Sequence, residues 1–190
     1  MAERVLAEVD RHGVLLVHDT TLPSVTTFVT GSPVEGSWWS HPMANAIYNA
    51  LGAIEDDVAV VKLIGGKNTL VARRLWPELV GVAGRSDAWQ LDRLADAAVD
   101  LVASIGAARD PVVVERSQRP LAEQLERRLL VHATEVHTAS GRHVKAYESW
   151  RAWAGQRGVV PVGDSASARL VFERIVAGFA PAGRRARLPW

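Results

Sequence analysis

Residues 58–76 read Val-Ala-Val-Val-Lys-Leu-Ile-Gly-Gly-Lys-Asn-Thr-Leu-Val-Ala-Arg-Arg-Leu-Trp. β-Branched and other apolar residues stand on both sides of Gly65 and Gly66, and this combination predicts two strands joined by a tight turn. Cationic residues crowd the expected tip. The stretch therefore predicts a β-hairpin with a positively charged end.

Residues 129–147 repeat the pattern and read Leu-Leu-Val-His-Ala-Thr-Glu-Val-His-Thr-Ala-Ser-Gly-Arg-His-Val-Lys-Ala-Tyr. β-Prone residues again flank a glycine, Gly141, and cationic residues follow it. A second hairpin with a cationic tip is therefore expected in the second half of the chain.

Helical signals precede the first hairpin. Apolar residues at helical spacing predict a helix over residues 2–11, and His12-Gly13 is a plausible end for it. The apolar run 14–17 is long enough for one strand, and Thr21-Leu-Pro23 begins a helix expected to reach Thr30. A further helix is expected over residues 42–54. The predicted order is helix, strand, helix, helix, strand, strand.

The second half approximates the same order. A long helix is expected over residues 88–105, followed from Asp110 by either a short helix or a short strand. Helices are further expected over residues 120–128 and 150–156, on either side of the second hairpin, and from residue 165 onward. The boundary between the halves is placed near Gly84, which gives one unit over residues 1–84 and a second over residues 85–190.

This order of elements is that of the winged helix, so the fold class expected is α+β, mainly helical, with tandem winged helix-turn-helix units and β-hairpin wings. The chain resembles the winged-helix DNA-binding superfamily over most of its length. Its tandem units resemble, more loosely, those of the bacterial winged-helix DNA glycosylases that unhook crosslinks. That family carries a catalytic Gln-x-Gln or Gln-x-Asp string, which none of the glutamines here forms, so no catalytic residue carries over.

Composition bounds the possible functions. The 190 residues are 48% hydrophobic, which is enough for real cores, and cysteine is absent, which excludes disulfides and thiol chemistry. No apolar stretch approaches the length of a membrane span, and the charged N-terminus is unlike a signal peptide, so a cytoplasmic protein is expected. The net charge of +1 divides into −2 over residues 1–85 (7 Lys+Arg against 9 Asp+Glu) and +3 over residues 86–190 (15 against 12).

In a winged helix the second helix of the turn pair enters the major groove and the wing contacts the backbone or the minor groove. In the first unit, the candidates for reading bases are Asn45, Tyr48 and Asn49, because asparagine can bind adenine through two hydrogen bonds. The helix carries no Lys or Arg, and packing against the second unit is the alternative for it. Phosphate contact is expected instead from the hairpin cations Lys62, Lys67, Arg73 and Arg74.

The second unit offers the more cationic surface. Its candidates for nucleic-acid binding are Arg116, Arg119, Arg142 and Lys145. The basic tail, with Arg184, Arg185 and Arg187, could add affinity that does not depend on base sequence, or could simply be a solubilising end.

Two adjacent tryptophans, Trp38 and Trp39, precede the helix expected at 42–54. They could form a stacking platform for an unpaired base, but packing in an interface between the units is the more common use of such residues.

One group of residues could support chemistry. Glu135, His137 and His143 lie on the second hairpin, where alternation puts Glu135 and His137 on one face and His143 lies across the turn. A carboxylate beside two imidazoles can act as a general acid and base, while cross-strand polar pairing is the ordinary alternative. The spacing matches no metal signature, and no motif for a nucleotide cofactor is present.

The leading hypothesis is a DNA-binding protein, either a transcriptional regulator or a DNA-repair accessory factor. The first alternative is an enzyme of the glycosylase or hydrolase type that acts on a nucleic-acid base or nucleotide. The second is a protein–protein interaction scaffold, which the low net charge favours. The sequence does not indicate an oligomeric state.

Overall fold

The computed structural model describes residues 1–137, 143–179 and 186–190, and for His137 and His143 it describes the backbone alone. The chain divides into two units. Unit 1 contains Met1–Trp76 and Arg169–Leu188, and unit 2 contains Pro77–Ala168 and Pro189–Trp190. Of the helices in the described ranges, none has the length and apolar character needed to cross a membrane.

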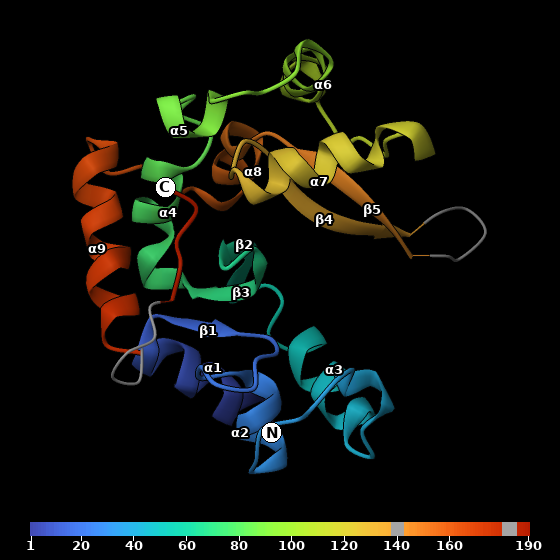
Figure 1. Cartoon of the computed structure of the whole chain (residues 1–190), viewed down its shortest axis with the longest axis vertical. Coiled ribbons are helices and arrows are strands. Elements are labelled where there is room, and N and C mark those ends of the chain that lie inside the picture. The colour runs from blue at the N-terminus through green and yellow to red at the C-terminus, as the bar shows by residue number, and fades with distance from the viewer. Residues whose placement is uncertain (138–142, 180–185) are drawn as a thin grey trace. The chain divides into compact units, whose positions relative to one another are not determined.

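Unit 1 follows the predicted order of elements (Figure 1). Its elements are α1 (Ala2–His12), β1 (Val14–Leu16), α2 (Val25–Thr30), the 3₁₀ turn η1 (Trp38–Ser40), α3 (Ala44–Gly52), β2 (Val58–Ile64), β3 (Lys67–Ala72) and the 3₁₀ turn η2 (Arg73–Leu75). Most of α9 (Ser165–Ala177) also belongs to this unit.

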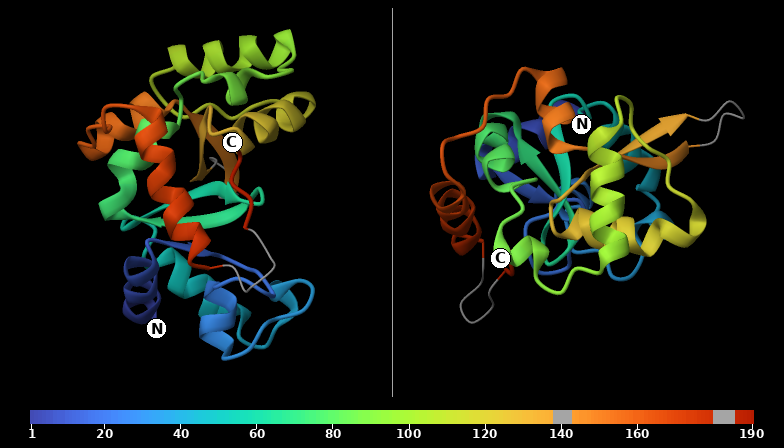
Figure 2. Two further views of the ribbon diagram at one scale, coloured as in Figure 1. Left: turned by 60° about the vertical axis from the view of Figure 1, so that its left-hand side comes forward. Right: turned by 90° about the horizontal axis from the view of Figure 1, so that it is seen from above.

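The sheet of unit 1 is antiparallel, with strand order β1-β3-β2. The hairpin of β2 and β3 can be followed in Figures 1 and 2, and β1 pairs with β3 on the side away from β2. Gly65 and Gly66 both have positive φ, at 58° and 68°, which a tight turn between twisted strands requires. The prediction of a hairpin around these glycines is therefore confirmed.

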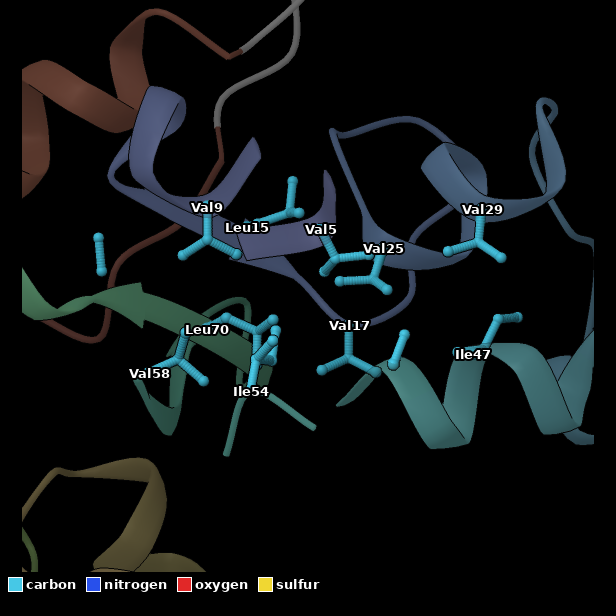
Figure 3. Packing of buried hydrophobic residues seen from close by; sticks show 12 residues of the cluster. Val5, Val9, Leu15, Val17, Val25, Val29, Ile47, Ile54, Val58 and Leu70 are labelled. Carbon is cyan, nitrogen blue, oxygen red and sulfur yellow. The ribbon is translucent and has the colours of Figure 1, made fainter. Parts of the chain in front are cut away.

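The core of unit 1 lies between the helices and one face of the sheet. Figure 3 shows Val5 of α1 beside Val25 of α2, with Leu70 of β3 and Ile47 of α3 in the same cluster. All four side chains are fully or almost fully buried. Burial of a side chain of this size contributes about 1.5–3 kcal/mol, so the cluster fixes how α3 sits on its own unit.

Unit 2 places helices against a second hairpin. Its elements are α4 (Trp76–Val82, from Pro77 onward), α5 (Ala88–Leu91), α6 (Asp96–Ala107), the 3₁₀ turn η3 (Arg116–Gln118), α7 (Arg119–Arg127), β4 (His132–His137), β5 (His143–Glu148), α8 (Trp150–Arg157) and the first residues of α9. The strands β4 and β5 are antiparallel, and Val112 forms an isolated antiparallel bridge to Tyr147 of β5.

The core of unit 2 is built around α6, which packs against α7 (Figure 2). Leu101 and Ile105 of α6 meet Leu125 of α7 and Tyr147 of β5 in one buried cluster. The bridge at Val112 resolves the choice left open at Asp110 in favour of extended backbone, because Val112 exchanges backbone hydrogen bonds of 2.8 and 2.9 Å with Tyr147.

The prediction of one long helix over residues 88–105 is wrong. The helix stops at Leu91, and Arg93 has a positive φ of 52° before α6 begins at Asp96. The cause is the fully buried side chain of Gln90, whose Nε2 donates to the carbonyl oxygens of Arg128 and Leu129 at 2.8 and 3.2 Å. Arg128 in turn donates to the carbonyl oxygens of Gln90 and Asp92, so this segment is held in a bend.

The division of the chain also differs from the boundary expected near Gly84. Unit 1 breaks off at Trp76 and takes in Arg169–Leu188 from the far end of the sequence. The sequence does not mark the point in α9 where the chain passes from unit 2 to unit 1. The helix has buried apolar residues, Ala168, Phe172 and Val176, on both sides of that point.

Gly13 generates a testable prediction about the stability of unit 1. Its φ is +83°, and an added Cβ would lie 2.9 Å from Leu75 Cδ1 and 3.2 Å from Ile175 Cδ1. Gly13→Ala is expected to lower the free energy of unfolding by about 1–3 kcal/mol through strain and overpacking, measured by urea unfolding. The matched control is Gly106→Ala in α6, where the added methyl meets open space and should raise stability by about 0.5–1 kcal/mol. Equal effects of the two substitutions would contradict the packing argument.

Candidate interaction surface

α3 presents the three predicted base-reading residues on one side. Ile47 and Ala50 face the core of unit 1, whereas Asn45, Tyr48 and Asn49 are exposed. Asn45 and Asn49 are one helical turn apart, so their amide groups lie on the same face. The structure therefore brings these three residues together at the surface.

Two tryptophans lie beside this face. Trp38 and Trp39 are stacked, with ring centroids 4.0 Å apart and an interplanar angle of 24°. Trp39 is 5.8 Å from the ring of Tyr48, at 46°, and these two side chains are 61% and 50% exposed. Trp38 is partly buried against the core of unit 1 and supports the outer ring. We refer to Trp38, Trp39 and Tyr48 as the aromatic surface.

Two hydrogen bonds, one to a side chain and one within the backbone, fix the link between η1 and α3. His41 Nδ1 accepts from the backbone N–H of Met43 at 3.1 Å, and the N–H of His41 donates to the carbonyl of Trp38 at 3.0 Å. The segment 38–43, which carries the ring of Trp39, is therefore held by these two hydrogen bonds.

The segment that carries the aromatic surface is acidic in sequence. Residues 20–61 contain no Lys or Arg and four carboxylates: Glu35, Glu55, Asp56 and Asp57. Glu35, Glu55 and Asp56 are exposed, and three of the four follow the C-terminus of α3, where the helix dipole adds partial negative charge.

Lys67, the cation nearest the turn of the first hairpin, is bound to its own unit. Its Nζ donates to Asp19 Oδ2 at 2.7 Å, and the Asp19 side chain is only 8% exposed. Burial alone would raise the pKa of Asp19. Hydrogen bonds from Lys67, from the backbone N–H groups of Leu22 and Thr21 and from the Thr21 hydroxyl outweigh burial and lower the pKa to about 2.

Arg73 and Arg74, two of the hairpin cations expected to contact phosphate, lie away from the tip of the hairpin. β3 ends at Ala72, so both arginines start η2 at the end of the strand away from the glycine turn. Arg73 lies 5.0 Å over the ring of Trp76 and donates to the carbonyl of Asp56 at 3.4 Å. Arg74 donates to the carbonyl of Asp10 at 3.1 Å. Lys62 is half-buried on β2, three residues before Gly65.

The second hairpin repeats this use of a lysine. Lys145 Nζ donates to Glu126 Oε2, and Glu126, on α7, is 8% exposed in its side chain. The ammonium group also lies 5.5 Å from the ring centroid of Tyr147. Arg116 and Arg119 are exposed on η3 and α7, and Arg142 lies outside the described residues.

The Glu135, His137 and His143 positions meet on the paired strands. Glu135 stands opposite Lys145 in the register, and His137 stands opposite His143. Glu135 is exposed, and the side chains of the two histidines lie outside the description. Within the part of the chain that is described, no group of three or more His, Asp or Glu side chains is arranged to hold a metal ion.

A buried polar pair in unit 2 was missed at the level of sequence. His132 Nδ1 lies 3.0 Å from Glu148 Oε1, with both side chains at or below 8% exposure. The rings of Trp150 and Trp153 lie 5.2 and 5.5 Å from the imidazole. His132 and Glu148 stand opposite each other in the strand register. Strand alternation puts His132 on the face opposite to that of Glu135, which indicates a buried histidine but does not identify its partner.

The Asp19–Lys67 pair predicts how unit 1 responds to acid. Because the folded pKa of Asp19 is about 2 and its ordinary value is 3.8, the pair stabilises the fold above pH 3.8, and this contribution is lost as the pH falls through 2. Asp19→Asn should therefore cost about 1–2 kcal/mol at pH 7, a figure reduced because Lys67 is 55% exposed, and should flatten the stability profile between pH 4 and 2. The exposed Glu55→Gln serves as the control. A profile that Asp19→Asn leaves unchanged would refute the pairing.

The raised pKa of Tyr147 leads to a prediction of how the stability of unit 2 changes at high pH. Burial, followed by the nearby charges of Glu126 and Glu123, raises the pKa of Tyr147 to about 12 from its ordinary value of 10. Stability that is complete below pH 10 should be lost as the pH rises through 12, because only the unfolded chain ionises readily in that window. In a Tyr48→Phe background, which leaves Tyr147 as the only tyrosine, ultraviolet titration should show tyrosinate near pH 12, and at lower pH after Glu126→Gln. Tyrosinate forming at pH 10 in the folded protein would contradict the burial argument.

Comparison with known proteins assigns no family. No protein-family model matches the chain, and neither a curated protein nor a solved structure matches it.

Proposed function

We propose that this chain is a binding protein in which unit 1 is a winged helix that contacts a protein partner through the aromatic surface and the exposed face of α3. The element order of unit 1 and its strand order β1-β3-β2 support a winged helix. The observation that carries the proposal is the pair of exposed rings, Trp39 and Tyr48, on the side where a winged helix presents its contact residues. Exposed Trp and Tyr anchors are enriched at protein–protein interfaces.

The electrostatics of unit 1 favour a protein over DNA at this face. DNA binding draws its affinity from Lys and Arg side chains that neutralise phosphates. Here Lys67 pairs with a buried carboxylate, Arg73 and Arg74 bind backbone carbonyls, and the segment carrying α3 holds four carboxylates without a cation. A polyanion approaching the aromatic surface would meet like charge.

DNA binding is the second candidate. It is favoured by the exposed amides of Asn45 and Asn49 at a spacing suited to base edges, and by the exposed Arg116 and Arg119 in unit 2. In that case the chain acts as a transcriptional regulator or a DNA-repair accessory factor. An enzyme acting on a nucleic-acid base, through Glu135, His137 and His143, stays a prediction.

A paired binding experiment tests the proposal. Peptides selected from a displayed random library on the full chain are expected to bind it. They should lose about tenfold or more in affinity to a Trp39→Ala/Tyr48→Ala variant, because buried aromatic anchors dominate such interfaces. The matched control is Val160→Ala, which removes another highly exposed apolar side chain, in unit 2, and should leave affinity unchanged. Circular dichroism checks that each variant is folded.

The same proteins are then titrated with labelled random-sequence duplex and single-stranded DNA at low salt. Little binding to either is expected. Tight DNA binding that Asn45→Ala/Asn49→Ala weakens, together with selected peptides that ignore the aromatic surface, would overturn the proposal in favour of the second candidate.

A further inference from the structure

We infer that the aromatic surface receives an arginine side chain from the partner protein, stacked on the open face of Trp39 beside Tyr48. This inference rests on the proposed function and specifies the chemistry of the partner. Three observations support it: the exposed rings of Trp39 and Tyr48, the Lys and Arg side chains that lie over other aromatic rings of this chain, and the negative charge of the segment that carries α3.

The outer face of Trp39 is available for stacking. One face of its indole is covered by Trp38 at 4.0 Å, so most of the 61% of the side chain that is exposed must belong to the other face and the ring edges. The ring of Tyr48 stands 5.8 Å from that of Trp39 at 46°, so a second exposed aromatic ring lies beside the first. Both rings are held in place by Trp38 and by α3, so little conformational freedom is lost when a ligand stacks.

Elsewhere this chain places cations over its own aromatic rings. Arg157 lies 4.7 Å from the ring centroid of Trp153, and Arg73 lies 5.0 Å from that of Trp76. Arg4 over Phe28 and Lys145 over Tyr147 lie at 5.4 and 5.5 Å. Across residues 1–136, 144–179 and 186–190, whose side chains are described, no Lys or Arg occupies the ring faces of Trp39 or Tyr48.

The charge of the neighbouring sequence is complementary to a cation. The carboxylates Glu55, Asp56 and Asp57 follow the C-terminus of α3, the helix that carries Tyr48. Glu35 is exposed four residues before Trp39. The residues that flank the aromatic surface in sequence are therefore acidic, which favours a cationic partner group over a phosphate.

Arginine fits this surface better than lysine. The guanidinium group is planar and weakly hydrated, so it can lie flat on an indole while its edge N–H groups bind carboxylates. An ammonium group is more strongly hydrated and has no flat face to stack. The expected order of preference is therefore arginine, then lysine, then an uncharged side chain of the same shape.

The probe is an eight-residue peptide with two arginines in a Gly-Ser background, compared with versions in which lysine, citrulline or alanine replaces both arginines. Binding to the full chain is followed by tryptophan fluorescence and by NMR shifts of the indole N–H groups. The arginine peptide should bind about two- to fivefold tighter per cation than the citrulline peptide, which keeps the shape without the charge. Added salt should narrow this difference.

Two variants locate the effect. Trp39→Leu keeps an apolar side chain but removes the ring, and should abolish the preference for arginine over citrulline. Glu55→Gln/Asp56→Asn should reduce the preference for arginine over citrulline and the salt dependence of that preference. The peptide should still shift the indole N–H signal of Trp39. Val160→Ala is again the control and should change neither.

Failure of this inference can be told apart from failure of the proposed function. If library-selected peptides depend on Trp39 and Tyr48 but show no arginine preference, the protein-binding proposal stands and this inference is wrong. A single-stranded oligonucleotide that displaces the arginine peptide and quenches Trp39 more strongly would overturn the inference and assign the surface to a nucleobase.

Discussion

In each unit a lysine of the hairpin pairs with a carboxylate that is almost removed from water, and this pairing constrains how the hairpin lies and which cations stay available. Asp19 and Glu126 are both nearly buried, and a carboxylate left unpaired in such a place costs several kcal/mol. Lys67 and Lys145 supply the opposite charge, and in doing so they hold each hairpin against helical or loop segments of the same unit. The strands are anchored by charge as well as by their apolar faces.

Because Lys67 and Lys145 are paired within their own units, they contribute little to surfaces that could bind a partner. Cations that satisfy internal carboxylates or carbonyls contribute less to attraction of a polyanion, because their charge is already compensated at short range. What unit 1 leaves exposed at η1 and α3 is aromatic and amide surface, with carboxylates close to it in the sequence. In the winged helix proposed for unit 1, α3 takes the position of a DNA-reading helix but has the surface chemistry of a protein contact, and fold alone does not choose between the two functions.

Much of the fold of unit 1 was predictable, because its signals are local: the glycine turn at 65–66 and the apolar periodicity each act within a few residues. The start of α2 was less exact, since the helix is capped by Ser24 and not at Thr21. The bend after Leu91 was not predictable, since it depends on Gln90 reaching the carbonyl oxygens of Arg128 and Leu129, far along the chain. The candidate site shows the same contrast. The exposed side of α3 follows from helical spacing, while the pairing of Lys67 with Asp19 and of His132 with Glu148 requires the tertiary structure.

The assignment of Arg169–Leu188 to unit 1 has a consequence for dissecting the protein. Unit 2 is, in sequence, an insertion between Trp76 and Arg169, apart from the last two residues, so a single truncation near the middle releases neither unit intact. A fragment ending at Gly84 would lack Ile175, whose side chain packs at Gly13. Excision of the inserted segment, with its flanking ends rejoined by a short linker, is the route to unit 1 alone.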